Sequence, residues 1–272
     1  MYQTTYHRAK SLAEAKNLFS GSGDAAYISG GHTLLPAMKA RLAAPSHLID
    51  LRHIPELRGI QVSGDTVSIG GATTHAEVSQ SREVESAIAT LAALAGSIGD
   101  AQVRHLGTIG GSVANNDPAA DYPAAVLALA GTVATDKRQI AADDYFTGLY
   151  TTALNEGEIV TRVSFKIPQQ SGYAKFRNPA SRYPMAGVFV AKHKDGSVRV
   201  AVTGAGNNGV FRWSAAEQAL ASNFAPDAVR GLTVDAGGMM GDIHGSPEYR
   251  ANLVAVMCRR ALENLGTAAA MH

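Results

Sequence analysis

The sequence predicts an α+β fold, and three observations support this prediction. Short apolar segments typical of strands, such as residues 25–29, are interspersed with helical patterns, such as residues 11–19. The chain has 272 residues, of which 46% are hydrophobic and 17% charged, and this globular composition can bury a sizeable core. The segment Gln-Gln-Ser-Gly at 169–172 is the best candidate for a boundary between two domains.

The first fifth of the chain predicts a helix and then a strand–glycine loop–helix–strand unit. The helix over 11–19 begins at Ser11, with Glu14 three residues later in a capping-box pattern. The strand over 25–29 runs into a pair of glycines, and the helix over 34–42 carries Pro36 in its first turn, where a missing N–H costs little. The strand over 48–51 completes the unit.

The later elements follow from the same patterns. A hairpin is predicted over 59–62 and 66–70, and a helix begins at His75 after the cap Thr74. The expected elements up to the boundary are then helices over 87–98 and 123–130, a glycine loop over 107–116, and strands over 132–134 and 158–167. Beyond it we expect strands over 173–177, 187–193 and 198–203, helices over 214–222 and 247–265, and a frayed tail after Gly266.

The composition excludes several classes of protein. Lys plus Arg number 24 and Asp plus Glu 23, and this balance argues against nucleic-acid and polybasic membrane-surface binding. The single cysteine, Cys258, cannot form an iron–sulfur cluster or a cysteine-rich zinc site, and we expect it to be a buried apolar residue. The histidines are scattered, so no metal site is expected. Because no secretory signal and no apolar run of membrane-spanning length are visible, we expect a cytoplasmic protein without an integral membrane segment.

Two glycine loops are the candidate binding elements. In the first, Ser29-Gly30-Gly31-His32-Thr33-Leu34, glycines after a strand let a ligand approach, and successive N–H groups suit an anion such as a diphosphate. The second, over 107–117, again combines paired glycines with hydroxyl and amide side chains. A plain tight turn is the alternative for either loop alone, but two loops together could hold the two ends of one diphosphate. The glycine pairs at 30–31, 70–71 and 110–111 are evenly spaced, which we interpret as coincidence.

Three further features have competing interpretations. Asp121 could accept a hydrogen bond from a ribose or flavin hydroxyl, or it could cap the helix that follows. The cations over 175–182 could lie near an anionic reduced flavin, or they could be solvated charges at a strand edge. The Gly-x-Gly-x-x-Gly pattern at 204–209 lacks the helix that a dinucleotide site requires directly after it, so we do not assign a nucleotide to it.

The two loops resemble segments of a known family. Residues 29–39 (SGGHTLLPAMK) and 107–112 (GTIGGS), the latter followed by Ala114-Asn115, resemble the FAD-binding medium subunits of molybdenum hydroxylases, which include the carbon monoxide dehydrogenase and xanthine dehydrogenase flavoproteins. The resemblance extends over nearly the whole chain, including 69–78, 119–121, 175–176 and 246–250. Thr33 replaces the usual serine, His105 replaces an asparagine, and Gly71 is an additional glycine.

The resemblance implies a vanillyl-alcohol-oxidase (PCMH)-type fold. An FAD-binding domain over 1–168 would comprise two α+β subdomains, about 1–55 and 56–168, and a C-terminal domain over 169–272 would have a small antiparallel sheet and helices. Backbone N–H groups of the two loops would hold the diphosphate, Asp121 would meet a ribose or ribityl hydroxyl, and Val160 would touch the ring system. Lys175 or Arg177 would approach the isoalloxazine. The implied cofactor-binding residues of the loops are Ser29, Gly30, Gly31, His32, Thr33, Leu34, Thr108, Ile109, Gly110, Gly111, Ser112 and Asn115.

The resemblance also implies an electron relay rather than acid–base chemistry, so no catalytic side chain is expected. Electrons would pass from a small partner subunit with two [2Fe–2S] clusters, through FAD, to an external acceptor. A large molybdopterin subunit would oxidise the substrate, in a dimer of heterotrimers. One alternative is a free-standing FAD-dependent oxidoreductase that acts directly on a small substrate or nicotinamide, and another is a scaffold without a flavin. The sequence leaves the substrate of the complex and the electron acceptor open.

Overall fold

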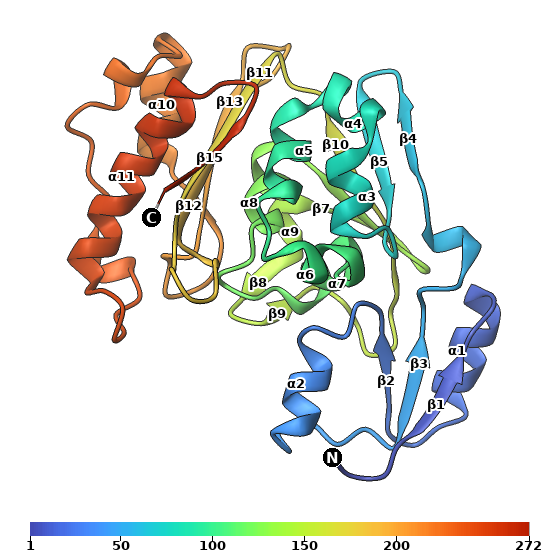
Figure 1. The fold of residues 1–272 in the computed structure, drawn as a ribbon. Helices are drawn as coiled ribbons and strands as arrows, with labels where there is room; N and C mark the ends of the chain where they lie inside the picture. Colours follow the sequence, from blue (N-terminus) through green and yellow to red (C-terminus); the bar gives the residue numbers. More distant parts are fainter. Residues whose placement is uncertain (272) are drawn as a thin grey trace.

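The structure is a computed structural model that describes residues 1–271, and it contains the mixture of helices and sheets that the sequence predicts (Figure 1). The first part of the chain forms a three-stranded parallel sheet in the order β1 (Thr5–Arg8), β3 (His47–Asp50), β2 (Ala25–Ile28). The helices α1 (Leu12–Ser20) and α2 (Leu34–Lys39) connect its strands. The predicted cap of α1 is confirmed, because the Ser11 side chain accepts a hydrogen bond from Glu14 N. Strand β1 was not expected from the sequence.

The middle of the chain forms a five-stranded antiparallel sheet. Its order is β4 (Ile60–Ser63), β5 (Thr66–Gly70), β10 (Val160–Lys166), β6 (Thr132–Thr135) and β7 (Gln139–Ala141). Six helices come between β5 and β6: α3 (His75–Gln80), α4 (Arg82–Ala87), α5 (Ala89–Gly96), α6 (Ala101–Leu106), α7 (Ile109–Asn115) and α8 (Tyr122–Ala128). The short elements α9 (Ala142–Tyr145), β8 (Phe146–Gly148) and β9 (Thr151–Thr152) precede β10.

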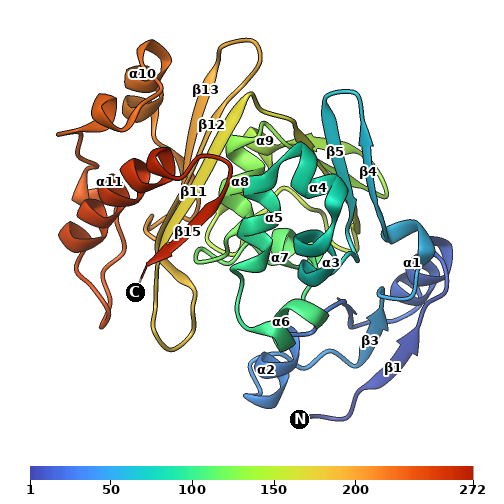
Figure 2. The same cartoon turned by 45° about the horizontal axis from the view of Figure 1, so that its top comes forward.

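The strands in the rest of the described chain form a third sheet. Its order is β14 (Phe211–Arg212), β13 (Val198–Thr203), β12 (Pro184–Lys192), β11 (Gln170–Arg177) and β15 (Ala268–Met271). Helices α10 (Ser214–Ser222) and α11 (Pro247–Glu263) lie on its outer side in Figures 1 and 2, and α5 and α8 lie between it and the middle sheet. The prediction of a frayed tail after Gly266 is wrong, because β15 pairs in parallel with β11. The sheet is therefore mixed rather than wholly antiparallel.

Two hydrophobic clusters fix this layered arrangement. One joins the middle sheet and its helices to Tyr173 and Phe189 on the inner face of the third sheet. The other packs the outer face of that sheet against α11, through residues such as Val190 and Val254. Because the third sheet is covered on both faces, β12 is a nearly continuous buried apolar strand. Within residues 1–271 no helix is long and apolar enough to cross a membrane.

The predicted glycine loop over 107–116 is mostly helical, which corrects the sequence analysis. Thr108 is the N-cap of α7, and its Oγ1 accepts a hydrogen bond from Gly111 N at 3.2 Å. Glycine is unfavourable inside a helix by about 1 kcal/mol per residue, and for this reason the sequence predicts a loop. The glycine is needed at 110, where a Cβ would lie 2.5 Å from the carbonyl oxygen of Gly71.

Candidate functional site

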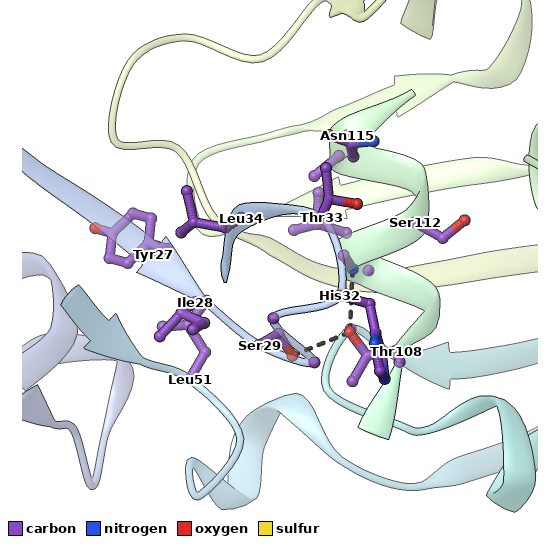
Figure 3. Close-up of a pocket in the computed structure, with 18 of the residues that line it drawn as sticks. Tyr27, Ile28, Ser29, His32, Thr33, Leu34, Leu51, Thr108, Ser112 and Asn115 are labelled. Carbon is purple, nitrogen blue, oxygen red and sulfur yellow. Dashed lines mark hydrogen bonds between the residues drawn. The ribbon is translucent and has the colours of Figure 1, made fainter. Parts of the chain in front are cut away.

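A cavity of about 560 Å³ lies between the first sheet and the helices of the middle part of the chain. This volume is in the range of sites that bind organic cofactors, about 300–1,000 Å³. Its wall is built from the end of β2 and the start of α2, from the segment after β5, from α7 and the turn before α8, and from the start of β10. Figure 3 shows side chains of this wall.

The two glycine loops meet at one wall of the cavity. Thr108 Oγ1 donates a hydrogen bond to Ser29 Oγ at 3.0 Å (Figure 3). A Cβ at Gly30 would lie 2.4 Å from the carbonyl oxygen of Leu106 and 2.6 Å from Gly107 Cα, so only glycine allows the two backbones to approach this closely. Both loops therefore face the same space, as the sequence analysis expected.

The third glycine pair also contributes to this wall. The carbonyl oxygen of Gly71 accepts a hydrogen bond from Gly110 N at 2.9 Å, and a Cβ at Gly71 would lie 2.3 Å from the carbonyl oxygen of Val160. Gly31, Gly71 and Gly110 all line the cavity. The even spacing of the pairs does not mark a repeat, but the pairs do share a site, which the sequence analysis missed. Close backbone packing also explains the additional glycine at 71.

The two loops differ in their free hydrogen-bond donors. Within residues 1–271 no acceptor is present for the backbone N–H groups of Gly30, Gly31, His32 and Thr33. Gly31 has a φ of +72°, which turns the chain between β2 and α2. In α7, by contrast, the first N–H groups donate within the chain: Ile109 N to Thr73 O, Gly110 N to Gly71 O, Gly111 N to Thr108 Oγ1 and Ser112 N to Thr108 O. The expectation that both loops present backbone donors thus agrees with the geometry of the first loop only.

Most of the residues predicted for the site do line the cavity. Besides the glycines, the wall contains Ser29, His32, Thr33, Leu34, Thr108, Ser112, Asn115, Asp121 and Val160. Ile109, the first residue of α7, is fully buried and contributes to the core instead. Lys175 and the half-buried Arg177 are not part of the wall.

Asp121 links the cavity to the third sheet. It is 4% exposed, and its Oδ1 accepts hydrogen bonds from Tyr173 Oη at 2.6 Å and from Lys175 Nζ at 2.8 Å. Asp121 does occupy the N-cap position of α8, as the alternative interpretation expected, but its side chain makes no capping hydrogen bond. Burial, and then the nearby Asp121 carboxylate, raise the pKa of Tyr173 well above its usual value, so this phenol keeps its proton.

Sequence reasoning missed several titratable residues in the wall, and two of them, His75 and Glu158, are buried. His75, at the start of α3, is 5% exposed, and burial followed by the nearby His32 and Arg104 lowers its pKa to about 4. Its Nδ1 is buried without a hydrogen-bond partner in residues 1–271. The cap Thr74 places this histidine at a helix start, but the sequence does not show that it packs against Gly107 in the wall, where a Cβ at Gly107 would lie 2.6 Å from His75 Nε2.

Glu158 is the second buried titratable residue that sequence reasoning missed. Its carboxylate accepts hydrogen bonds from Thr135 Oγ1 at 2.6 Å, Arg138 Nε at 3.1 Å and Asn155 N at 2.8 Å. Burial raises its pKa, but these donors outweigh burial and the pKa falls to about 2. No local motif distinguishes this glutamate in the sequence. Tyr183, from the third sheet's β11–β12 turn, also reaches the cavity and is 47% exposed.

The remaining motifs lie elsewhere. The pattern at 204–209 does not line the cavity, and α10 begins only at Ser214 after β14. A Cβ at Gly204 would lie 2.3 Å from the carbonyl oxygen of Pro184, so this glycine has a packing role. Cys258 is buried in α11, and burial raises the pKa of its thiol to about 12. In the part of the chain that the structure describes, no cluster of His, Cys, Asp and Glu could hold a metal ion.

Comparison with known proteins assigns this architecture to a family. Residues 2–170 match the family model of the FAD binding domain in molybdopterin dehydrogenase. The carbon monoxide dehydrogenase medium chain of Hydrogenophaga pseudoflava is 35% identical over 94% of this chain and 95% of that protein. The nicotine 6-hydroxylase medium subunit of Paenarthrobacter nicotinovorans is 37% identical over 96% of both chains. The crystal structure of quinoline 2-oxidoreductase from Pseudomonas putida 86 matches with a TM-score of 0.86 and 26% identity over 96% of both chains. The chain therefore belongs to the family of FAD-binding subunits of molybdopterin dehydrogenases, and FAD is its cofactor.

Proposed function

We propose that the cavity holds FAD with its diphosphate on the first glycine loop. The observation that carries this proposal is the row of four backbone N–H groups, from Gly30 to Thr33, that have no acceptor within residues 1–271. Successive N–H groups without partners suit phosphate oxygens, and glycine leaves room for close approach. The site fits this group.

The second loop has a different part in this proposal. Its backbone N–H groups are already used, so α7 would contribute the hydroxyl of Ser112 and the amide of Asn115, while Thr108 fixes the first loop through Ser29. Asp121 would accept a hydrogen bond from a ribose or ribityl hydroxyl, and Val160 would contact the ring system, because both line the cavity. Lys175 is too deeply buried for direct contact with the ring.

The proposed activity is electron relay within a complex. Bound FAD would supply the redox chemistry through which electrons from the [2Fe–2S] clusters of a small partner subunit reach an external acceptor. This chain's own residues would bind and orient the cofactor and shield it from water, while the half-exposed Tyr183 marks an accessible edge. A free-standing oxidoreductase is not favoured, because the relatives are named as medium subunits.

We further propose a large molybdopterin subunit as the second partner, an assembly of two heterotrimers, and a cytoplasmic location. The substrate belongs to the large subunit in this proposal. This assignment of the substrate is supported by two relatives that are similarly identical to this chain, at 35% and 37%, yet are named for different substrates, carbon monoxide and nicotine. The proposed division into domains at residue 168, with subdomains 1–55 and 56–168, is supported by the start of the third sheet at Gln170.

Purification of the chain together with its native partners tests this function. We expect a yellow complex that releases FAD on heating and contains molybdenum and iron in the other subunits. A colourless chain that takes up no FAD would contradict the proposal and favour a scaffold. Turnover of a reduced substrate by the isolated flavin-loaded chain would favour the free-standing oxidoreductase.

A further inference from the structure

Lys175 is a buried cation that does not reach the cavity. Its side chain on β11 is 0% exposed and is not part of the cavity wall. Burial of an ammonium group is costly unless the charge is paired and hydrogen-bonded. Its Nζ donates to Asp121 Oδ1 at 2.8 Å and to the carbonyl oxygen of Ser97 at 3.0 Å. Ser97 is the C-cap of α5, where carbonyl groups favour a cation.

Asp121 stands between this cation and the cavity. Its Oδ1 accepts hydrogen bonds from both Lys175 Nζ and Tyr173 Oη, and both donors belong to β11. Its Oδ2 has no hydrogen-bond donor within residues 1–271, although Asp121 lines the cavity. The two donors thus fix one oxygen of the carboxylate and leave the other available to a ligand.

We propose that Lys175 is a positioning residue for FAD binding, which acts by holding the Asp121 carboxylate so that Oδ2 accepts a hydrogen bond from a sugar-type hydroxyl of the cofactor. This inference rests on the proposed function, because it needs FAD in this cavity. It extends the cofactor site to the third sheet, which supplies both donors to the carboxylate. If Lys175 served stability alone, its carboxylate partner would not need to lie in the cavity wall, where Asp121 lies.

A second lysine–aspartate pair provides a matched control. Lys194, in the turn after β12, pairs with Asp65 in the turn between β4 and β5. Like Lys175 and Asp121, this pair joins the third sheet to the middle part of the chain, but its side chains are 56% and 73% exposed and do not line the cavity. Lys194→Met therefore removes a lysine–aspartate contact between the same parts of the chain without touching the site.

The test is a double-mutant cycle on the full chain. FAD is removed and then titrated back into the wild type, Lys175→Met, Asp121→Asn, the double variant and Lys194→Met, all below the unfolding temperature of each. Loss of a hydrogen bond to a charged group corresponds to roughly a 10- to 100-fold weaker Kd for Lys175→Met and for Asp121→Asn. We expect the double variant to bind no more weakly than Asp121→Asn, and Lys194→Met to bind as the wild type does. The visible circular dichroism of the bound flavin should change in Lys175→Met but not in Lys194→Met.

Three results would overturn the inference. The first is a Lys175→Met chain that is less stable yet binds FAD with unchanged Kd and dichroism, which would mean that Lys175 only stabilises the fold. A full additional loss in the double variant would mean that Lys175 acts independently of Asp121. A wild-type chain that takes up no FAD would instead refute the proposed function itself. If Lys175→Met does not fold, Tyr173→Phe removes the other donor and enters the same cycle with Asp121→Asn, with the same criterion of non-additivity.

Discussion

The hydroxyl of Thr108 donates a hydrogen bond to the hydroxyl of Ser29 at 3.0 Å, and this bond joins the N-cap of α7 to the end of β2. The two residues are 79 positions apart in the sequence. Their contact confirms the prediction that two separated glycine loops meet in space. That both loops serve one FAD diphosphate stays a prediction, with the backbone donors on the first loop.

Thr108→Val should weaken both the fold and the cofactor site. It removes the cap on Gly111 N and the bond to Ser29, and loss of an N-cap typically costs about 0.5–2 kcal/mol of unfolding free energy. Urea unfolding and FAD titration would measure the two effects. Thr108→Ser keeps the hydroxyl and should restore most of both. Equal stability and equal affinity for Thr108→Val and the wild type would refute this role.

Gly30→Ala should be poorly tolerated. The added Cβ would meet backbone atoms of Leu106 and Gly107, which cannot move aside as a flexible side chain can, and overpacking of this kind costs about 1–3 kcal/mol. We expect a lower unfolding temperature and weaker FAD binding. Gly23→Ala is the control, since a Cβ there meets nothing within 4 Å. The packing argument fails if both variants behave like the wild type.

His75 should make stability depend on pH. Its pKa is about 4 in the folded chain against 6.5 ordinarily, so from pH 6.5 down to about 4 the unfolded chain binds a proton that the folded chain does not. The contribution of neutral His75 to the unfolding free energy is therefore complete above pH 6.5 and is lost as the pH falls toward 4. Relative to His75→Gln, the wild type should lose up to about 1.4 kcal/mol of unfolding free energy per pH unit in this window. Denaturant unfolding at several pH values measures the difference, and parallel curves would contradict it. His244→Gln, at an exposed histidine, should leave the curve unchanged.

Glu158, like His75, should make the chain less stable as the pH falls, but in a lower pH range. Because its folded pKa is about 2 against 4.5 ordinarily, its stabilisation is present above pH 4.5 and is lost as the pH falls through about 2. At neutral pH, Glu158→Gln should cost about 1–3 kcal/mol, since donors from Thr135, Arg138 and Asn155 lose a charged acceptor. The difference in unfolding free energy between the wild type and Glu158→Gln should become smaller as the pH falls toward 2. Glu56→Gln, at an exposed glutamate, is the control. A Glu158→Gln chain as stable as the Glu56→Gln chain would count against this network.

Local signals in the sequence predicted much of the framework. The cap at Ser11, the turn between β4 and β5, and the glycines after β2 each involve neighbouring residues, so periodicity and turn chemistry were sufficient. The helical state of α7 could not be predicted, because its glycines are unfavourable in a helix and are accepted only where Gly110 packs on Gly71.

Non-local contacts set the limit for the site. Asp121 and Lys175 are 54 positions apart, so the sequence suggested a charge near each without showing that they neutralise one another. His75 packs against Gly107 in the cavity wall, a contact between residues far apart in the sequence. Strand β15 forms because β11 offers it an edge, which a local pattern of three alanines and a methionine does not indicate.

A crystal structure of the full chain with FAD tests the central claim most directly. We predict that the diphosphate oxygens lie within hydrogen-bonding distance of the backbone N–H groups of Gly31, His32 and Thr33. A dinucleotide seated at residues 204–209, or a diphosphate remote from the turn between β2 and α2, would contradict the account.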